Sequence, residues 1–174
     1  YLKVLNFYDR HFNYKWLAKR IIGNLETKED RIFRLFQWTY DTIKPQPKSL
    51  PIMDDHVWNV YVRGYGVSDN FHDLFTTLCS YVGVEAVFHR LKIKDPDKLI
   101  GLSFVKLEKG WVVFDPFKGG YFLNKMGGWA TIEEIKNKNW RMEKIGSAEI
   151  ADSFYKPFLE VLPDIESIDL GRAN

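Results

Sequence analysis

The feature that most constrains the fold is the stretch 63–83, in which a glycine-rich segment runs into a strongly amphipathic one. Apolar side chains recur there at helical spacing: Phe71, Leu74, Phe75, Leu78, Cys79 and Val82. This period predicts a helix with one buried face, and Gly83 predicts its C-terminal end. Ser68 stands where the helix begins, and unpaired backbone N–H groups there favour an anion. Serine is also a common N-cap, so a chemical role and a capping role both remain open.

Helical patterns precede strand patterns along the chain. We expect one helix over 13–22 and a second that starts from a capping box at Thr27 and ends before 44–48. Residues 49–67 read as loop with some short structure, and short helices are expected near 131–134 and 148–160. Strands are predicted over 85–94, 99–107, 111–115 and 121–123, with turns at 95–97 and 108–110. This order predicts an α+β fold, in one domain over 1–174 with a helical part at 1–44 and a core at 60–138.

The composition excludes several classes of function. The net charge is +2 and the basic residues form no block, so we expect no nucleic-acid partner. No apolar run is long enough to cross a membrane and no signal peptide is visible, so we expect a soluble protein of open localisation. The one cysteine, Cys79, excludes an internal disulfide and reads as a small buried hydrophobe.

Metal binding is weakly indicated at one place only. Asp54, Asp55 and His56 are adjacent and carry groups that ligate metals, but a hydrogen-bonded turn is the more common use of such a triplet. We therefore predict no metal and no cofactor.

Several motifs together resemble the transglutaminase-like superfamily. They are Gly66-Val67-Ser68, the helix segment 74–79, Gly83-Val84 and the hairpin that ends in Gly110-Trp111 and Asp115-Pro116; the tracts 55–58 and 63–66 resemble bacterial members. The resemblance covers roughly residues 14–138 and implies a papain-like fold, with helices first and an antiparallel sheet second.

The resemblance also implies a Cys-His-Asp triad, which this sequence only partly retains. The nucleophile position corresponds to Ser68, the histidine position to Leu102 and the aspartate position to Asp115; residues 100–103 contain no histidine. A serine without an adjacent base is a poor nucleophile. In a serine protease, loss of nucleophile and base together slows turnover about a millionfold, or about 8 kcal/mol of barrier.

Two functions follow from this reading. The first is a non-catalytic domain whose remaining cleft, near Tyr65, Ser68, Leu102 and Asp115, binds an extended peptide or a glycan. Aromatic rings that could contact such a ligand are Trp58, Trp111 and Trp129, although core packing is the more common role for any one of them.

The second function is an atypical serine-dependent hydrolase or acyl transferase. It would use Ser68 and Asp115 with His72, four residues after Ser68, as the base. A partly exposed polar position on the helix is the simpler interpretation of His72, and His11, His56 and His89 are less well placed. A structural domain without any ligand also fits the sequence, and the oligomeric state stays open.

Overall fold

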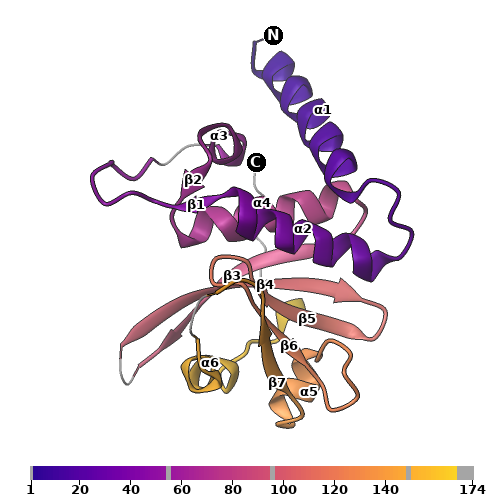
Figure 1. Cartoon of the computed structure of the whole chain (residues 1–174), viewed down its shortest axis with the longest axis vertical. Coiled ribbons are helices and arrows are strands. Elements are labelled where there is room, and N and C mark those ends of the chain that lie inside the picture. Colours follow the sequence, from indigo (N-terminus) through magenta and orange to yellow (C-terminus); the bar gives the residue numbers. More distant parts are fainter. Residues whose placement is uncertain (1, 54–55, 95–96, 148–149, 168–174) are drawn as a thin grey trace.

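A computed structural model describes residues 2–53, 56–94, 97–147 and 150–167. A five-stranded antiparallel sheet in the order β3-β4-β5-β6-β7 separates two helical layers (Figure 1). Its strands are β3 (Ala86–Ile93), β4 (Lys98–Leu107), β5 (Gly110–Asp115), β6 (Gly120–Leu123) and β7 (Arg141–Lys144). The predicted α+β class is therefore confirmed.

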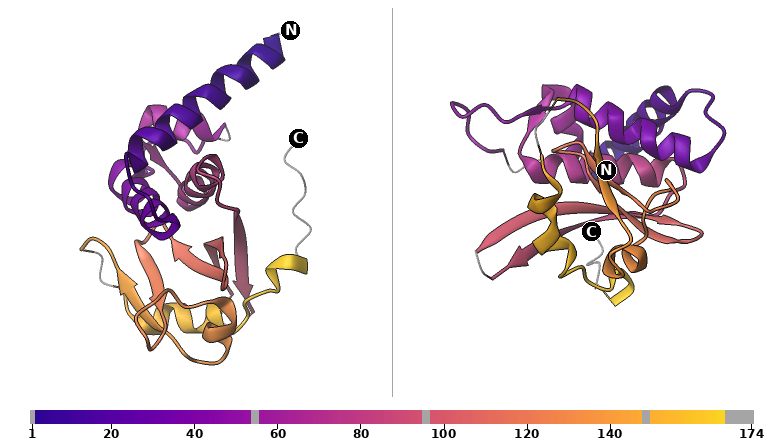
Figure 2. Two further views of the ribbon diagram at one scale, coloured as in Figure 1. Left: turned by 90° about the vertical axis from the view of Figure 1, so that its right-hand side faces the viewer. Right: turned by 60° about the horizontal axis from the view of Figure 1, so that its bottom comes forward.

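The N-terminal helices cover one face of the sheet, and the two later helices lie on the other face (Figure 2). The first layer holds α1 (Leu2–Ile22), α2 (Lys28–Thr42), α3 (Val57–Arg63) and α4 (Ser68–Tyr81). The second layer holds α5 (Ile132–Lys136), α6 (Asp152–Leu159) and the short η1 (Ile165–Ser167). The strands β1 (Lys44–Pro45) and β2 (Tyr65–Gly66) form a separate parallel pair.

Helix α4 is the centre of the first core. Its side chains Phe71, Leu74, Phe75, Leu78 and Cys79 are at most 1% exposed, because α2 packs on one side of the helix and the sheet on the other. Burial of each large apolar side chain contributes about 1.5–3 kcal/mol. A second core, with Leu102, Phe104, Phe122, Tyr155 and Phe158, fills the space between the sheet and α6.

The caps that the sequence predicts are present at two helices. Thr27 accepts a hydrogen bond from the Asp30 N–H at 3.0 Å and begins α2, and Thr131 and Glu134 form a capping box at α5. Gly83, with φ of +79°, follows the end of α4, and Gly110, with φ of +128°, lies at the β4–β5 turn.

Other expectations about local structure are wrong. Helix α1 begins at Leu2 instead of near Asn13, and β7 was not expected at all. The short structure expected within 49–67 consists of α3 and β2. Residues 95 and 96 of the turn predicted at 95–97 lie outside the described residues. None of the helices in the described part combines the length and the apolar character that a membrane span requires.

Candidate functional site

The first turn of α4 carries Ser68 as its first helical residue. The N-cap is Val67, whose backbone N–H donates to Asn70 Oδ1 at 3.0 Å, so Ser68 does not have the capping role that the sequence left open. Within the described chain, the half-buried Ser68 hydroxyl makes no hydrogen bond. Gly66 lets the chain approach this turn closely, since a Cβ there would lie 2.7 Å from Asn70.

His72, one turn further along α4, is fully buried and not partly exposed as expected. Its ring stacks on Phe88 of β3 at 5.0 Å between centroids, and its Nδ1 lies 2.9 Å from Ser103 Oγ on β4. A Cβ on Gly101 would come within 2.9 Å of the ring. The imidazole therefore fills the space over β4 that the missing side chain of Gly101 leaves.

Asp115, at the end of β5, is buried and fully engaged. Its Oδ1 accepts the N–H groups of Phe117 and Lys118 at 3.1 and 3.0 Å, and its Oδ2 accepts the Tyr155 hydroxyl of α6 at 2.8 Å. Burial raises the pKa of Asp115 to about 6, although these hydrogen bonds act in the opposite direction.

His72 and Asp115 lie close to each other in the protein interior. His72 Nε2 lies 3.8 Å from Asp115 Oδ1 and has no hydrogen-bond partner in the described part of the chain. Burial lowers the pKa of His72 to about 3, so the imidazole is neutral at pH 7. The tautomer that suits the site keeps the proton on Nε2, toward the carboxylate, while the Ser103 hydroxyl donates to Nδ1.

Ser103, His72, Asp115 and Tyr155 thus form a continuous buried chain of polar groups. Their composition matches a Ser-His-Asp arrangement, but Ser103 is 0% exposed and no substrate can reach its hydroxyl. The sequence did not indicate Ser103 or Tyr155, because both contacts join residues that are far apart along the chain: 31 residues for His72–Ser103 and 40 for Asp115–Tyr155.

Leu102 lies on the opposite face of β4 from Ser103. It belongs to the second core with Phe104, whereas Val105 belongs to the first core with α4, as the alternation of a strand requires. We expected Leu102 and Asp115 to line an open cleft, but they are 0% and 1% exposed, so neither contributes to an accessible surface.

The aromatic candidates pack against other rings. Trp58 contacts Tyr14 edge-on at 5.1 Å, and Trp129 contacts Phe114 at 5.0 Å. Trp111 is the second residue of β5, near the opposite end of the strand from Asp115, and the ammonium of Lys106 lies over its ring. Tyr65 lies in β2 with the guanidinium of Arg63 at 5.6 Å from its ring centroid.

The described residues include no group of three or more potential ligands that could hold a metal ion. His56 caps α3 by accepting the Trp58 N–H at 3.2 Å, and Asp54 and Asp55 lie outside the described residues. Cys79 is fully buried in α4, and burial raises the pKa of its thiol. This thiol therefore offers no nucleophile.

A cavity of about 480 Å³ opens beside the first turn of α4, between the end of α2 and the loop after Asp115. Phe71 and Phe117 contribute apolar surface, and Asp41, Lys44 and Lys118 contribute charges. This volume falls within the range that small ligands occupy in proteins.

Comparison with known proteins gives a family match and several structural matches, two of which follow. The family model of the transglutaminase-like superfamily matches residues 15–116. A presumed cysteine protease from Cytophaga hutchinsonii has a TM-score of 0.54 at 15% identity, over 80% of this chain and 49% of that chain. A presumed protease from Parabacteroides distasonis has a TM-score of 0.49 at 8% identity, over 59% of this chain and 23% of that chain. No curated protein matches significantly.

The likeness to the Cytophaga protein is one of fold alone, because the identity is low. The chain spans about half the length of that protein. Together with the family match, this likeness confirms the papain-like fold that the sequence resemblance implied.

Proposed function

Because this chain belongs to the transglutaminase-like superfamily, we propose that it is a member without catalytic activity and that it acts by binding. In this proposal Ser68, Leu102 and Asp115 occupy the positions of the family's cysteine, histidine and aspartate. Only the aspartate keeps the chemical group that the mechanism needs.

The observation that carries the proposal is the isolation of the Ser68 hydroxyl. A serine nucleophile needs a base within about 3 Å. The nearest histidine along α4, His72, directs Nδ1 to Ser103 and Nε2 toward Asp115. The only cysteine, Cys79, is 0% exposed and cannot replace the missing nucleophile.

The binding part of the proposal rests on the cavity beside α4. Its mixture of aromatic and charged lining residues suits an extended peptide or a glycan, which present apolar surface and hydrogen-bonding groups together. The occupant would lie next to the turn that holds Ser68, without contact to the buried Asp115.

One observation favours a second function, an atypical serine-dependent hydrolase or acyl transferase. His72 Nε2 and Asp115 Oδ1 are 3.8 Å apart, and an imidazole beside a carboxylate is the base half of a triad. The imidazole would have to turn from Ser103 to Ser68 for this reaction to occur.

Labelling with a serine-reactive fluorophosphonate separates the two functions. We expect no label on Ser68, read by mass spectrometry of the intact protein and its peptides, in the wild type or in His72→Gln. Label that appears on Ser68 and disappears in both Ser68→Ala and His72→Gln would support the hydrolase and overturn the first proposal.

Peptide and glycan arrays test the binding part. We expect ligands whose binding falls in Lys118→Glu, which places a carboxylate at the cavity, and persists in Lys28→Glu, an exposed residue of α2 that does not line it. If both variants bind as the wild type does, the cavity is not the site.

A further inference from the structure

A second cavity lies on the other side of the sheet, between α5 and α6. It has a volume of about 660 Å³, and its floor is apolar, with Ile135 and Leu159 only 3% and 2% exposed. Trp140 forms one wall, and its ring packs nearly perpendicular to that of Phe122, at 5.6 Å between centroids. This cavity shares no lining residue with the one beside α4.

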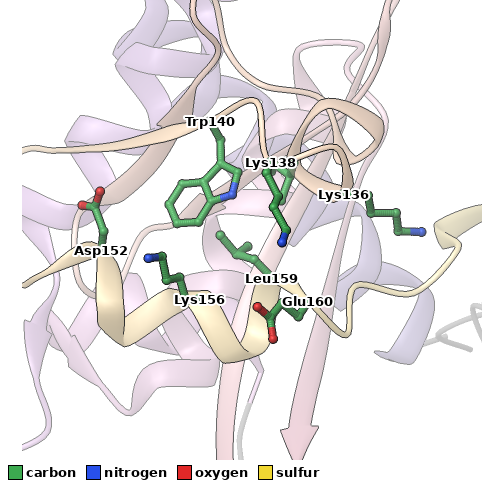
Figure 3. A pocket seen from close by; sticks show the side chains of 8 residues that line it. Lys136, Lys138, Trp140, Asp152, Lys156, Leu159 and Glu160 are labelled. Carbon is green, nitrogen blue, oxygen red and sulfur yellow. The ribbon is translucent and has the colours of Figure 1, made fainter.

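Two lysine side chains, from different elements, lie over this floor (Figure 3). Lys138 extends over Leu159, and Lys156 lies beside the ring of Trp140, whereas Lys136 points away. Among the described residues, no acidic side chain lies within ion-pair distance of Lys138 or Lys156. Glu160 and Asp152 also line the cavity, so the two lysines that lie over it are balanced by two carboxylates.

The backbone of Lys138 adds an independent observation. Its φ is +55°, the one positive value among the non-glycine residues that the structure describes. Lys138 follows the C-cap of α5, where its N–H donates to Ile135 and the Asn139 N–H donates to Glu134. This hydrogen-bond pattern usually has glycine at the position of Lys138, because a side chain raises the conformational energy there.

A strained residue is retained where its side chain has a use. The last turn of α5 already has Lys136 to interact favourably with the helix dipole, so Lys138 is not needed for that purpose. The strained conformation instead directs a second ammonium over the cavity floor.

We propose that the cavity between α5 and α6 binds a small carboxylate that carries a planar ring. The ring would stack on Trp140 above the apolar floor, and the carboxylate would accept hydrogen bonds from Lys138 and Lys156. Two ammonium groups with two carboxylates beside them suit a monoanion better than a polyphosphate. This site is separate from the cavity beside α4 and does not depend on the function proposed for it.

Nuclear magnetic resonance of the indole N–H groups tests the site, with 2-naphthoate as the probe. The Trp140 signal is assigned by its absence in Trp140→Phe. We expect this signal to shift saturably with 2-naphthoate, and much less with the neutral 2-naphthamide or with acetate, which lacks the ring.

Two lysine variants and one control complete the test. Lys138→Gly and Lys156→Ala should each weaken 2-naphthoate binding about fivefold or more, as loss of a charged hydrogen bond implies. Lys138→Gly relieves the backbone strain, so a loss of binding there cannot come from unfolding. Lys28→Ala, on the opposite layer, should bind unchanged. A Trp140 signal that does not shift, equal binding of the amide, or unchanged binding in Lys138→Gly would each overturn the proposal.

Discussion

Burial favours the neutral form of both His72 and Asp115: it lowers the pKa of the histidine and raises the pKa of the aspartate. The native imidazole resists protonation until about pH 3, whereas an unfolded histidine takes up a proton near pH 6.5, so the contribution of His72 to stability is lost as pH falls through that interval. Native Asp115 takes up a proton near pH 6 and the unfolded group near pH 3.8, so its contribution is lost as pH rises between them.

Because these two pH dependences have opposite signs, the combined contribution of His72 and Asp115 to the free energy of unfolding should change little between pH 4 and 6. In Asp115→Asn only His72 remains, and the free energy of unfolding should decrease on acidification by up to about 1.4 kcal/mol per pH unit relative to the wild type. In His72→Asn the relative slope should have the opposite sign. Urea unfolding of the three proteins at pH 4.5, 5.2 and 6 measures both slopes, and parallel curves would contradict the assignment of these pKa shifts.

The reactivity of a cysteine placed at position 68 tests whether this position is accessible and whether the helix dipole favours a thiolate there. In Ser68→Cys the new thiol is half-exposed at the positive end of the α4 dipole, which favours the thiolate, whereas the native Cys79 is buried with a raised pKa. We expect iodoacetamide to modify the new cysteine within minutes to hours and to leave Cys79 unmodified in the folded protein. Modification of Cys79 in the folded wild type would show that α4 opens more readily than its packing implies.

Single-residue roles were the hardest part to predict from the sequence. The N-cap of α4 is Val67, one residue before Ser68. Valine is not a usual capping residue, and here the side chain of Asn70 accepts the hydrogen bond of the Val67 N–H instead. His72 was expected to be partly exposed because it is polar, whereas Ser103 and the gap above Gly101 accommodate it in the core. A contact across 31 residues depends on how the helix lies against the strand, which periodicity does not determine.

At the scale of elements, local patterns predicted the segments with a clear helical period or with strand-forming residues between turn residues. Helix α2 has one buried face, and the strands β3 to β6 are rich in apolar and aromatic residues and bounded by turns, so both were expected close to their observed positions, although β4 is buried on both faces. Helix α1 was expected only from residue 13, because its first part exposes Leu5, Phe7, Tyr8 and Phe12 to solvent and so lacks a contrast between faces. Strand β7 was not expected because its sequence, Arg-Met-Glu-Lys, is largely polar.

The two parts of α1 should respond differently to substitution. Leu17 is 3% exposed and packs in the first core, so Leu17→Ala should lower the free energy of unfolding by about 2–5 kcal/mol. Phe12 is 64% exposed on the part that projects beyond the other helices (Figure 1), so Phe12→Ala should change it by less than about 0.5 kcal/mol. Urea denaturation of both variants gives the comparison, and a large loss in Phe12→Ala would mean that its face is covered in solution.

For the whole molecule, the sheet joins two cores that the sequence predicted only in outline. The family resemblance implied the helices and sheet on the α4 side, and the matched region ends at residue 116. The packing of α6 against the sheet lies beyond that region and depends on Tyr155, which fits over Gly120 and donates to Asp115. One hydrogen bond therefore connects the second helical layer to the buried His72–Asp115 pair.

Substitution of Gly120 tests this connection. A Cβ on Gly120 would lie 2.7 Å from the Tyr155 hydroxyl oxygen, and the buried ring has little room to move, so Gly120→Ala should destabilise the protein by about 1–3 kcal/mol. The matched control is Gly128→Ala, whose Cβ would meet nothing closer than 3.5 Å and should be nearly neutral.

Hydrogen exchange then shows which part of the protein loses stability in Gly120→Ala. If α6 is held to the sheet mainly through Tyr155, its amides in Gly120→Ala should exchange faster than those of α2, because local opening of α6 becomes easier while the α4 core stays packed. Equal acceleration in both helices would instead mean that the two layers unfold as one unit and that the Tyr155–Asp115 contact stabilises the entire fold.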